Sequence, residues 1–253
     1  MEMLKSIILA VVQGVTELLP ISSTAHLILI SEYLDIEMGT YLLSVLHLGT
    51  TIALIFYFLQ TLPKELYQKK HISFWLKVLL STLPAGIFGL LFKNIIEERL
   101  RSTSIIIFSL LFWGIAIILT DRIKRRKKKI TDVTWKQAVA IGVSQIIAFL
   151  PGTSRSAITT ITGILVGVEK YTSLQFSFLL GLPLLLGASL YGIMEKGIFT
   201  LCTIPNCVLL IVSGGFTYIT LKVLNKYSKR RWLTFFGVYR IILALILLLL
   251  TLK

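Results

Sequence analysis

Glu17, His26 and Arg155 can do acid–base or anion chemistry, and all three stand between strongly apolar stretches of the chain. They fall in two short polar segments, Gln13–His26 (QGVTELLPISSTAH) and Ser144–Ala157 (SQIIAFLPGTSRSA). A charged side chain costs about 2.5–3.5 kcal/mol at the centre of a membrane helix, so it is usually kept for a function or a partner. The two segments therefore predict a chemical site.

The two segments resemble each other and are interpreted as a repeat. With Pro20 aligned on Pro151, each reads as an apolar run, Leu-Pro, a further residue and a cluster of hydroxyl side chains. In this alignment Arg155 falls on Thr24. Glu17 and His26 of the first copy are aligned with Ala148 and Ala157 of the second. We expect the first copy to carry acid–base chemistry and the second to bind phosphate.

The composition places these segments in a membrane protein. Hydrophobic residues make up 55% and charged residues 15% of the 253 residues, whereas soluble domains carry about 25% charged residues. A spanning helix needs about 20 mostly apolar residues. The stretches that meet this requirement are Thr40–Gln60, Phe74–Phe92, Ser104–Thr120, Leu174–Glu195, Leu201–Leu221 and Trp232–Leu252.

The positive charge is concentrated in three short loops. The net charge is +14, and sixteen of the 26 Lys and Arg residues lie in Lys64–Lys70, Arg122–Lys136 and Lys222–Arg231. Loops of this kind are retained on the cytoplasmic side of a membrane. Nucleic acid is not an expected partner, because the run RIKRRKKK has no aromatic side chains on which bases could stack.

Placing the three basic loops on one side sets the direction of every span. The segment 137–167 must then enter and leave from that side, as a re-entrant hairpin broken at Pro151. The segment 3–34 enters from the other side and is broken at Pro20. Two similar hairpins from opposite sides describe an inverted-topology repeat, whose binding site lies near the middle of the membrane.

The sequence thus predicts an all-α integral membrane protein with six transmembrane helices and two re-entrant helical hairpins. It forms one membrane domain, 1–253, made of a first repeat, 1–120, and a second repeat, 132–253. The alternative is that Pro20 and Pro151 merely kink complete spans, as Pro84 and Pro183 are expected to do.

Gln13 and Glu17 are four residues apart, so both side chains project from one helix face. Glu17 is a candidate general base, or a ligand of a divalent cation together with Gln13. The structural alternative is that Glu17 pairs with Arg155 only to neutralise its charge.

Hydroxyl side chains open the second half of each hairpin, where a new helix is expected to run through Tyr33 and toward Val166. We interpret Ser22 and Thr153 as the N-cap residues of these half-helices. Free N–H groups at two helix starts also suit an anion with several charges, such as a diphosphate. The candidate ligands of its oxygens are Ser22, Thr24, Thr153, Ser154, Arg155 and Ser156.

His26 follows Ser23 by three residues and shares its helix face. A serine hydroxyl, an imidazole and the Glu17 carboxylate supply a nucleophile, an acid or base and an orienting group, as phosphoryl transfer requires. His47, in an apolar span, is either a core histidine or a group that supports the site. His71 lies in a basic loop and is expected to have no role.

At these residues the chain resembles the undecaprenyl-diphosphate phosphatase family, the bacitracin-resistance membrane phosphatases. QGVTELLPISSTAH and PGTSRSA are similar to the two signature motifs of that family, and the resemblance covers the whole chain. It implies an enzyme that removes the terminal phosphate of undecaprenyl diphosphate and so regenerates the lipid carrier of peptidoglycan synthesis. It also implies a bacterial cytoplasmic membrane, a site open toward the outer face, and a divalent cation, Mg²⁺ or Ca²⁺. The oligomeric state stays open, a homodimer included.

The resemblance places the family's acidic motif on Gln13 and Glu17, its Ser-Ser-Thr-Gly-His motif on Ser22–His26, and its Pro-Gly-Thr-Ser-Arg-Ser-Gly motif on Pro151–Ala157. We expect Arg155 to hold the diphosphate while Ser23 or an activated water attacks the terminal phosphorus. Glu17 and His26 are expected to divide the base and acid roles.

Three positions depart from the family pattern. Gln13 replaces the more frequent Glu, and Ala25 and Ala157 replace Gly. Because alanine disfavours a positive φ, we expect helical geometry at both alanines. The rival interpretation is a polyprenyl-phosphate flippase, which would use the same anion pocket but needs neither a hydroxyl nucleophile nor Glu17.

Overall fold

A computed structural model describes residues 2–92, 95–96, 100, 102–124, 129–227 and 232–251. Residues 125–128 and 228–231 of the basic loops, and the predicted end of the last span at Leu252, lie outside this part. The described residues are mostly helical and contain no β-strand. The α-helices are α1 (Glu2–Thr16), α2 (Ser23–Leu34), α3 (Thr40–Thr61), α4 (Ile72–Leu91), α6 (Thr103–Asp121), α7 (Trp135–Ser144), α8 (Arg155–Leu165), α9 (Lys170–Lys196), α10 (Ile204–Tyr227) and α11 (Trp232–Thr251). The short 3-10 helices are η1 (Lys64–Tyr67), η2 (Lys69–His71), η3 (Ile130–Asp132), η4 (Gln145–Phe149) and η5 (Ile198–Cys202).

Six helices in the described part are long and apolar enough to cross a membrane: α3, α4, α6, α9, α10 and α11. They coincide with the six predicted spans, which confirms a multi-pass, all-α membrane protein. The start of α10 differs from the prediction by three residues, because Ile198–Cys202 forms a separate 3-10 helix before it. α9 starts at Lys170, earlier than predicted, because the Glu169 side chain accepts a hydrogen bond from Thr172 N and caps the helix.

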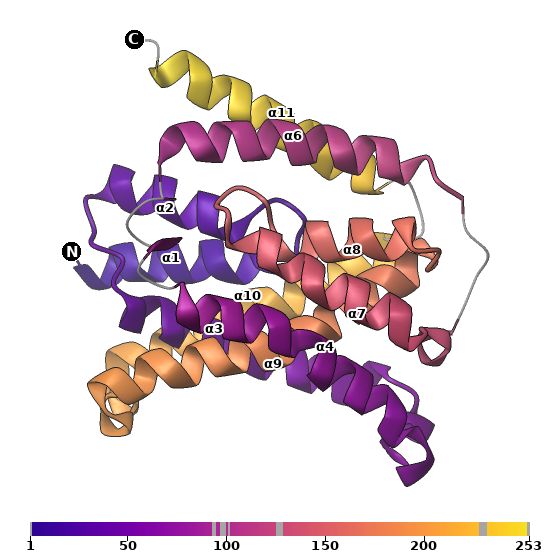
Figure 1. Cartoon of the computed structure of the whole chain (residues 1–253). Helices are drawn as coiled ribbons and strands as arrows, with labels where there is room; N and C mark the ends of the chain where they lie inside the picture. Colours follow the sequence, from indigo (N-terminus) through magenta and orange to yellow (C-terminus); the bar gives the residue numbers. More distant parts are fainter. Residues whose placement is uncertain are drawn as a thin grey trace.

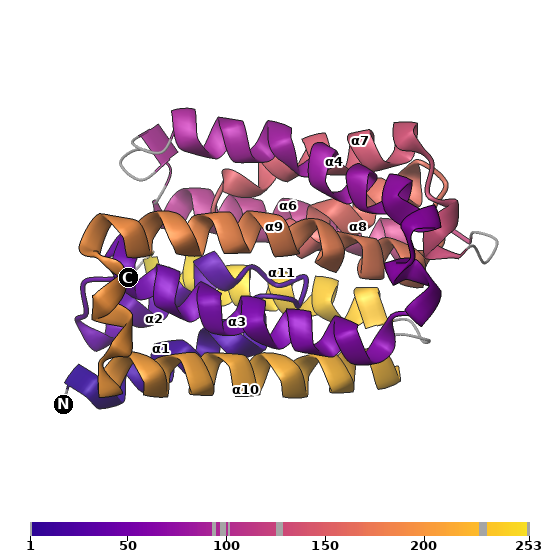
Figure 2. The ribbon, with the colours of Figure 1, turned by 90° about the horizontal axis from the view of Figure 1, so that it is seen from below.

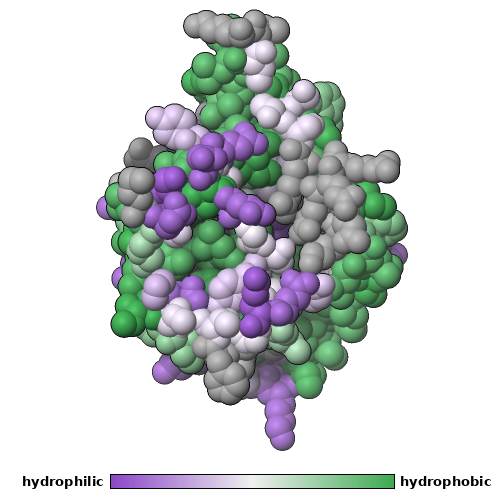
Figure 3. Space-filling view, turned by 90° about the vertical axis from the view of Figure 1, so that its left-hand side faces the viewer, coloured by the Kyte–Doolittle hydropathy of each residue, from purple (hydrophilic) through white to green (hydrophobic). Residues whose placement is uncertain are grey.

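The helix ends that flank the three basic loops lie at one end of the molecule (Figure 1). α3, α6 and α10 end there, and α4, α7, α9 and α11 begin there. α1 begins and α11 ends at the opposite end. Seen from that opposite end, hydrophilic side chains gather in the middle of the face and hydrophobic side chains cover its flanks (Figure 3). This distribution suits helices that cross a bilayer lengthwise.

Two pairs of shorter helices form helical hairpins, α1 with α2 and α7 with α8. They extend inward from opposite ends of the molecule, so that their turns meet in the middle (Figure 1). Pro20 and Pro151 lie in these turns rather than inside a helix, whereas Pro84 and Pro183 lie within α4 and α9. That the hairpins are re-entrant in the membrane, and that the repeats divide at 1–120 and 132–253, stay predictions.

The longer helices enclose the meeting point of the hairpins. α3 packs against both α9 and α10, and α9 also packs against α4 and α8 (Figure 2). α1 packs against α10, and α6 lies along α11. Each hairpin turn, together with the start of the half-helix that follows it, is called a tip from here on: residues 17–26 and 150–157. Their position between these helices keeps polar groups away from lipid.

Candidate active site

Glu17, in the first tip, is the centre of the site, and its side chain is only 7% exposed. Ser23 Oγ donates a hydrogen bond to Glu17 Oε2 at 2.6 Å, and Gln13 Nε2 donates to the same oxygen at 3.1 Å. Arg155 Nη2 donates to Oε1 at 3.0 Å. His47 Nε2, on α3, lies 3.8 Å from Oε2. The carboxylate therefore joins both hairpins to a spanning helix.

Arg155 is the first residue of α8, and its guanidinium also lies against α9. Its Nη1 donates to the carbonyl oxygen of Ser177 at 3.3 Å. A Cβ on Gly181 would lie 1.7 Å from Nη1, so a side chain at this position would displace the guanidinium. The ion pair with Glu17 agrees with the structural alternative of charge neutralisation. That alternative gives no reason for Ser23 to bind the same carboxylate.

Both half-helices begin after a serine with the same positive φ. Ser22 and Ser154 each have a φ of 72°. Each hydroxyl accepts a hydrogen bond from the N–H three residues on, that of Ala25 or Ala157. A positive φ is uncommon for serine and turns the chain sharply into the helix. Both alanines are helical, as predicted.

The N-cap prediction is right for Ser22 and wrong for Thr153. The cap of α8 is Ser154, because the second tip holds one more residue between its proline and its cap. Thr153 is fully buried, and its hydroxyl has no hydrogen-bond partner among the described residues.

This extra residue also corrects the alignment of the two copies. The first helical residues of α2 and α8 are Ser23 and Arg155, so the partner of Arg155 in the first copy is Ser23 and not Thr24. Both of these equivalent residues contact Glu17. The two copies thus present a hydroxyl and a guanidinium to one carboxylate.

Ser154 and Ser156, two predicted ligands of the diphosphate, hold the tips together. Ser156 Oγ donates to the carbonyl oxygen of Leu19 at 2.9 Å, and Ser154 Oγ donates to the same oxygen at 3.4 Å. Thr24, a third predicted ligand, is exposed on α2. The structure therefore brings together Gln13, Glu17, Ser23 and Arg155, and it does not place the Thr24 side chain with them.

His26 is held by α11 rather than by Glu17. Its Nδ1 lies 2.8 Å from the carbonyl oxygen of Ser22, so Nδ1 carries the proton in the neutral ring. Its Nε2 lies 2.7 Å from Tyr239 Oη, so the tyrosine hydroxyl donates to it. The two rings stack with an interplanar angle of 8°. The helix face shared with Ser23 does not bring the imidazole to the carboxylate.

Arg240, on α11, is fully buried and joins both tips. Its Nη1 donates to the carbonyl oxygen of Pro20 at 3.0 Å, and its Nη2 donates to that of Gly152 at 2.5 Å and to that of Ser109 at 3.3 Å. Pro20 and Gly152 are equivalent, because each lies two residues before a cap serine. Within the described part of the chain, no carboxylate lies at ion-pair distance from Arg240. One guanidinium therefore fixes the two tips relative to each other.

The family model of bacitracin resistance protein BacA matches residues 6–246. The chain belongs to this family. It is 35% identical over 266 aligned positions to Undecaprenyl-diphosphatase 1 of Clostridioides difficile (strain 630), covering 98% of this chain and 96% of that protein. It is 32% identical over 268 positions to an undecaprenyl-diphosphatase of Enterococcus faecalis, covering 99% and 97% of the two chains. An undecaprenyl-diphosphatase of Geotalea daltonii is 37% identical over 259 positions, with 95% of each chain covered.

The candidate site includes three residues that the sequence analysis did not assign to it. His47 had been left open, and Tyr239 and Arg240 were overlooked in the last span. Arg240 is the only charged residue in Trp232–Leu252, so its position in an apolar span was a usable signal. Tyr239 carried no such signal, because tyrosine is common in membrane helices.

The predicted cation ligands of this BacA-family chain are Gln13 and Glu17, which contact each other through the amide nitrogen. The other amide atom, Gln13 Oε1, is buried and has no hydrogen-bond partner among the described residues. No group of three or more His, Cys, Asp or Glu side chains in that part of the chain could hold a metal ion. Mg²⁺ is often held by one or two carboxylates together with substrate phosphates. Gln13 Oε1 and a Glu17 carboxylate oxygen therefore fit a cation whose other ligands come from the substrate. They do not form a complete metal site by themselves.

Proposed function

We propose that this chain hydrolyses undecaprenyl diphosphate to undecaprenyl phosphate and phosphate, which recycles the lipid carrier of peptidoglycan synthesis and confers bacitracin resistance. One observation carries the proposal: the Ser23 hydroxyl donates to buried Glu17 at 2.6 Å, while Arg155 of the other hairpin binds the second carboxylate oxygen. A nucleophile, a base and an anion-binding group thus form one hydrogen-bonded set. The relatives that the chain resembles carry the name of this activity.

The diphosphate binds where the two tips meet. Helix starts leave their first N–H groups without intrahelical acceptors, and the helix dipole adds partial positive charge there. α2 and α8 both start at this point, and Arg155 adds a planar fork of donors that matches phosphate oxygens. Ser22 and Ser154 cap the two helix starts, and Ser156 holds the second tip to the first through the Leu19 carbonyl. The buried Thr153 hydroxyl, which has no partner among the described residues, is kept as a ligand of the diphosphate. Thr24 contributes its backbone N–H.

Phosphoryl transfer then follows from the contact between Ser23 and Glu17. Glu17 takes the proton of Ser23 Oγ, and this oxygen attacks the terminal phosphorus. The bond from that phosphorus to the bridging oxygen breaks, undecaprenyl phosphate leaves, and the proton passes to it. Glu17 next deprotonates a water that attacks the phosphorus of the phosphoserine. The bond from phosphorus to Ser23 Oγ breaks, phosphate leaves, and Glu17 returns the proton to Ser23 Oγ. His26 positions the half-helix that carries Ser23, because its Nδ1 binds the carbonyl of the cap residue.

Gln13 Oε1 and Glu17 would hold a divalent cation, Mg²⁺ or Ca²⁺, together with the diphosphate. When bound, such a cation neutralises charge on the phosphate oxygens as the transition state forms. All other contacts described for the site join one protein group to another and need no cation.

We infer from the basic loops that follow α3, α6 and α10 that this end of the molecule lies in the cytoplasm. The first hairpin then enters from the outer face of a bacterial cytoplasmic membrane, and the site opens toward that face. The undecaprenyl chain lies in lipid beside the spanning helices.

The test is phosphate release from undecaprenyl diphosphate by the purified protein. We expect Arg155→Ala to release almost no phosphate while it elutes from a sizing column as the wild type does. A chelator should stop the wild-type reaction, and added Mg²⁺ or Ca²⁺ should restore it. His71→Asn, in a basic loop, is the control that should keep full activity.

Phosphate release by Arg155→Ala at the wild-type rate would contradict the proposed site. A flippase needs an anion pocket but not the Ser23–Glu17 contact, so this contact favours hydrolysis over transport. Transport of a polyprenyl phosphate across vesicles without any phosphate release would reverse that conclusion.

A further inference from the structure

A groove of about 310 Å³ runs between α3 and α10 on an exposed side of the molecule. Its walls are apolar: Ile52 and Phe56 of α3 are 53% and 54% exposed, and Ile211 of α10 is 73% exposed. Gly214 and Gly215 leave room between these side chains. The volume lies at the lower end of the range for ligand pockets, about 300–1,000 Å³.

The groove is separate from the active site, although both use α3. Successive helical residues are about 100° apart, so Phe56 lies on the face of α3 opposite His47. His47 faces Glu17, and Phe56 lines the groove. A molecule in the groove is thus kept from the catalytic residues by the body of α3.

The groove ends in polar and cationic groups near the basic end of α10. Tyr218 lines it, and the Tyr218 hydroxyl donates to Gln60 Oε1 at 2.7 Å. Lys222 Nζ lies 4.7 Å from the centre of the Tyr218 ring. Lys222 is exposed, and in the described residues no carboxylate forms an ion pair with it. The Tyr218 end of this apolar groove therefore has an exposed cation, Lys222, beside it.

We infer that this groove binds one anionic phospholipid of the cytoplasmic leaflet. An acyl chain lies along Ile52, Phe56 and Ile211, and the lipid phosphate lies at Lys222. The charge agrees with this occupant, because anionic lipids of that leaflet attract basic side chains next to membrane helices. The depth agrees as well, because α3 and α10 both end in basic loops at this level.

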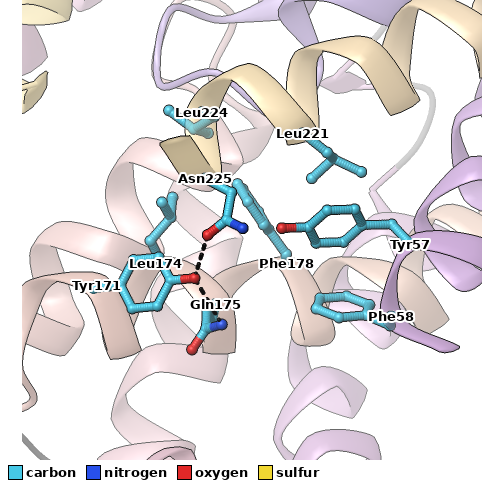
Figure 4. A pocket seen from close by; sticks show the side chains of 9 residues that line it. All are labelled: Tyr57, Phe58, Tyr171, Leu174, Gln175, Phe178, Leu221, Leu224 and Asn225. Atoms are coloured by element: carbon cyan, nitrogen blue, oxygen red, sulfur yellow. Dashed lines mark hydrogen bonds between the residues drawn. The ribbon is translucent and has the colours of Figure 1, made fainter. Parts of the chain in front are cut away.

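A second copy of the chain suits the groove less well. In a closed two-fold pair about an axis along the membrane normal, the same residue of both copies lies at the same depth of one interface. Such a pair would bring the two Lys222 charges into one apolar interface without a counter-ion from the described residues of this groove. The cavity shown in Figure 4, between α3, α9 and α10, is no alternative lipid site. Its volume of about 10 Å³ has room for about one water, and Tyr171 and Asn225 close it with a hydrogen bond of 2.5 Å.

Gly215 offers a clean way to fill the groove. A Cβ added at Gly215 meets no atom within 4 Å, so a larger side chain enters the groove without disturbing the helix pair. Gly187, on α9, is also exposed and equally open, and it lies outside the groove. Gly215→Leu and Gly187→Leu therefore form a matched pair, to which Lys222→Gln adds a test of the charge.

The experiment is native mass spectrometry of the purified full chain with phosphatidylglycerol or phosphatidylcholine of the same acyl chains. Wild type and Gly187→Leu should retain one phosphatidylglycerol in preference to phosphatidylcholine, and Gly215→Leu should lose it. Lys222→Gln should bind phosphatidylglycerol about fivefold more weakly, the factor expected for one basic side chain at an anionic surface. Phosphate release by Gly215→Leu in detergent should stay at the wild-type level, which shows that the variant is folded.

Three results would overturn the inference. Equal retention of phosphatidylglycerol by Gly215→Leu and wild type would place the lipid elsewhere. If undecaprenyl phosphate displaces phosphatidylglycerol from the wild type and not from Gly215→Leu, the groove is a prenyl site. A wild-type dimer that Gly215→Leu converts to a monomer would make it an interface between copies.

Discussion

The two hairpin tips share one backbone design and differ in the side chains that it presents. Both half-helices start after a cap serine with a φ of 72°, and both first helical residues contact Glu17. The first tip supplies a hydroxyl there, and the second supplies a guanidinium. The repeat therefore provides the geometry, and single substitutions within it provide the chemistry.

The second difference between the tips is what holds them. Hydroxyl groups of the second tip bind the Leu19 carbonyl of the first, whereas the first tip makes no such bond in return among the described residues. Arg240 binds both tips from α11 at equivalent carbonyls. α11 thus binds both tips in the same way, although, in the part of the chain that the structure describes, only the second tip donates hydrogen bonds to the other.

The largest expected effect comes from removing the base of the first tip. Glu17→Gln keeps the shape of the side chain but cannot accept the Ser23 proton, so kcat should fall by about 10²–10⁴, the usual contribution of a general base. Phosphate release by purified protein measures it. An unchanged kcat would remove Glu17 from the chemistry and leave it as a partner for Arg155.

The next effect distinguishes two adjacent hydroxyls of the same tip. Ser23→Ala should lower kcat by at least about 10², because the nucleophile is lost. Thr24→Ala removes a neighbouring hydroxyl that is exposed and should change kcat much less. If the two variants keep similar activity, water and not Ser23 attacks the phosphorus.

A smaller effect is expected when the anchor of both tips is weakened. Arg240→Lys keeps the charge but cannot bind two carbonyls with a planar fork, so the tips should lose their relative position. We expect kcat to fall about tenfold to a hundredfold, because a small misplacement of reacting groups costs that much in rate. The melting temperature in detergent should also be lower. Wild-type values for both quantities would show that the tips hold each other without Arg240.

The smallest effect concerns the imidazole that the second tip lacks. Tyr239→Phe removes only the hydroxyl that donates to His26 Nε2. Loss of one hydrogen bond of about 1 kcal/mol should lower kcat about fivefold, with KM unchanged. A fall as large as that of Glu17→Gln would instead give His26 and Tyr239 a direct part in proton transfer.

Much of the fold was predictable, because long apolar runs and basic loops follow strong rules of length and charge. The six spans, and two hairpins that extend from opposite ends of the molecule, needed no more than these rules. The contact of Gln13 with Glu17 followed from helical spacing.

The alignment of the tips was not predictable, because one extra residue in a turn shifts every residue after it. The shift moved the cap from Thr153 to Ser154 and made Ser23 the equivalent of Arg155. The contacts of His26 and Arg240 depend on α11, which lies more than 200 residues from the first tip along the chain. Such contacts are set by tertiary packing, which local patterns do not contain.

The central claim is that the two tips act as one site through Glu17 and Arg155. Phosphate release by the wild type, Glu17→Gln, Arg155→Lys and the double variant tests it most directly. If the tips act as one unit, the double variant should lose far less activity than the product of the two single losses. Losses that multiply would show that Glu17 and Arg155 act independently and would contradict the account.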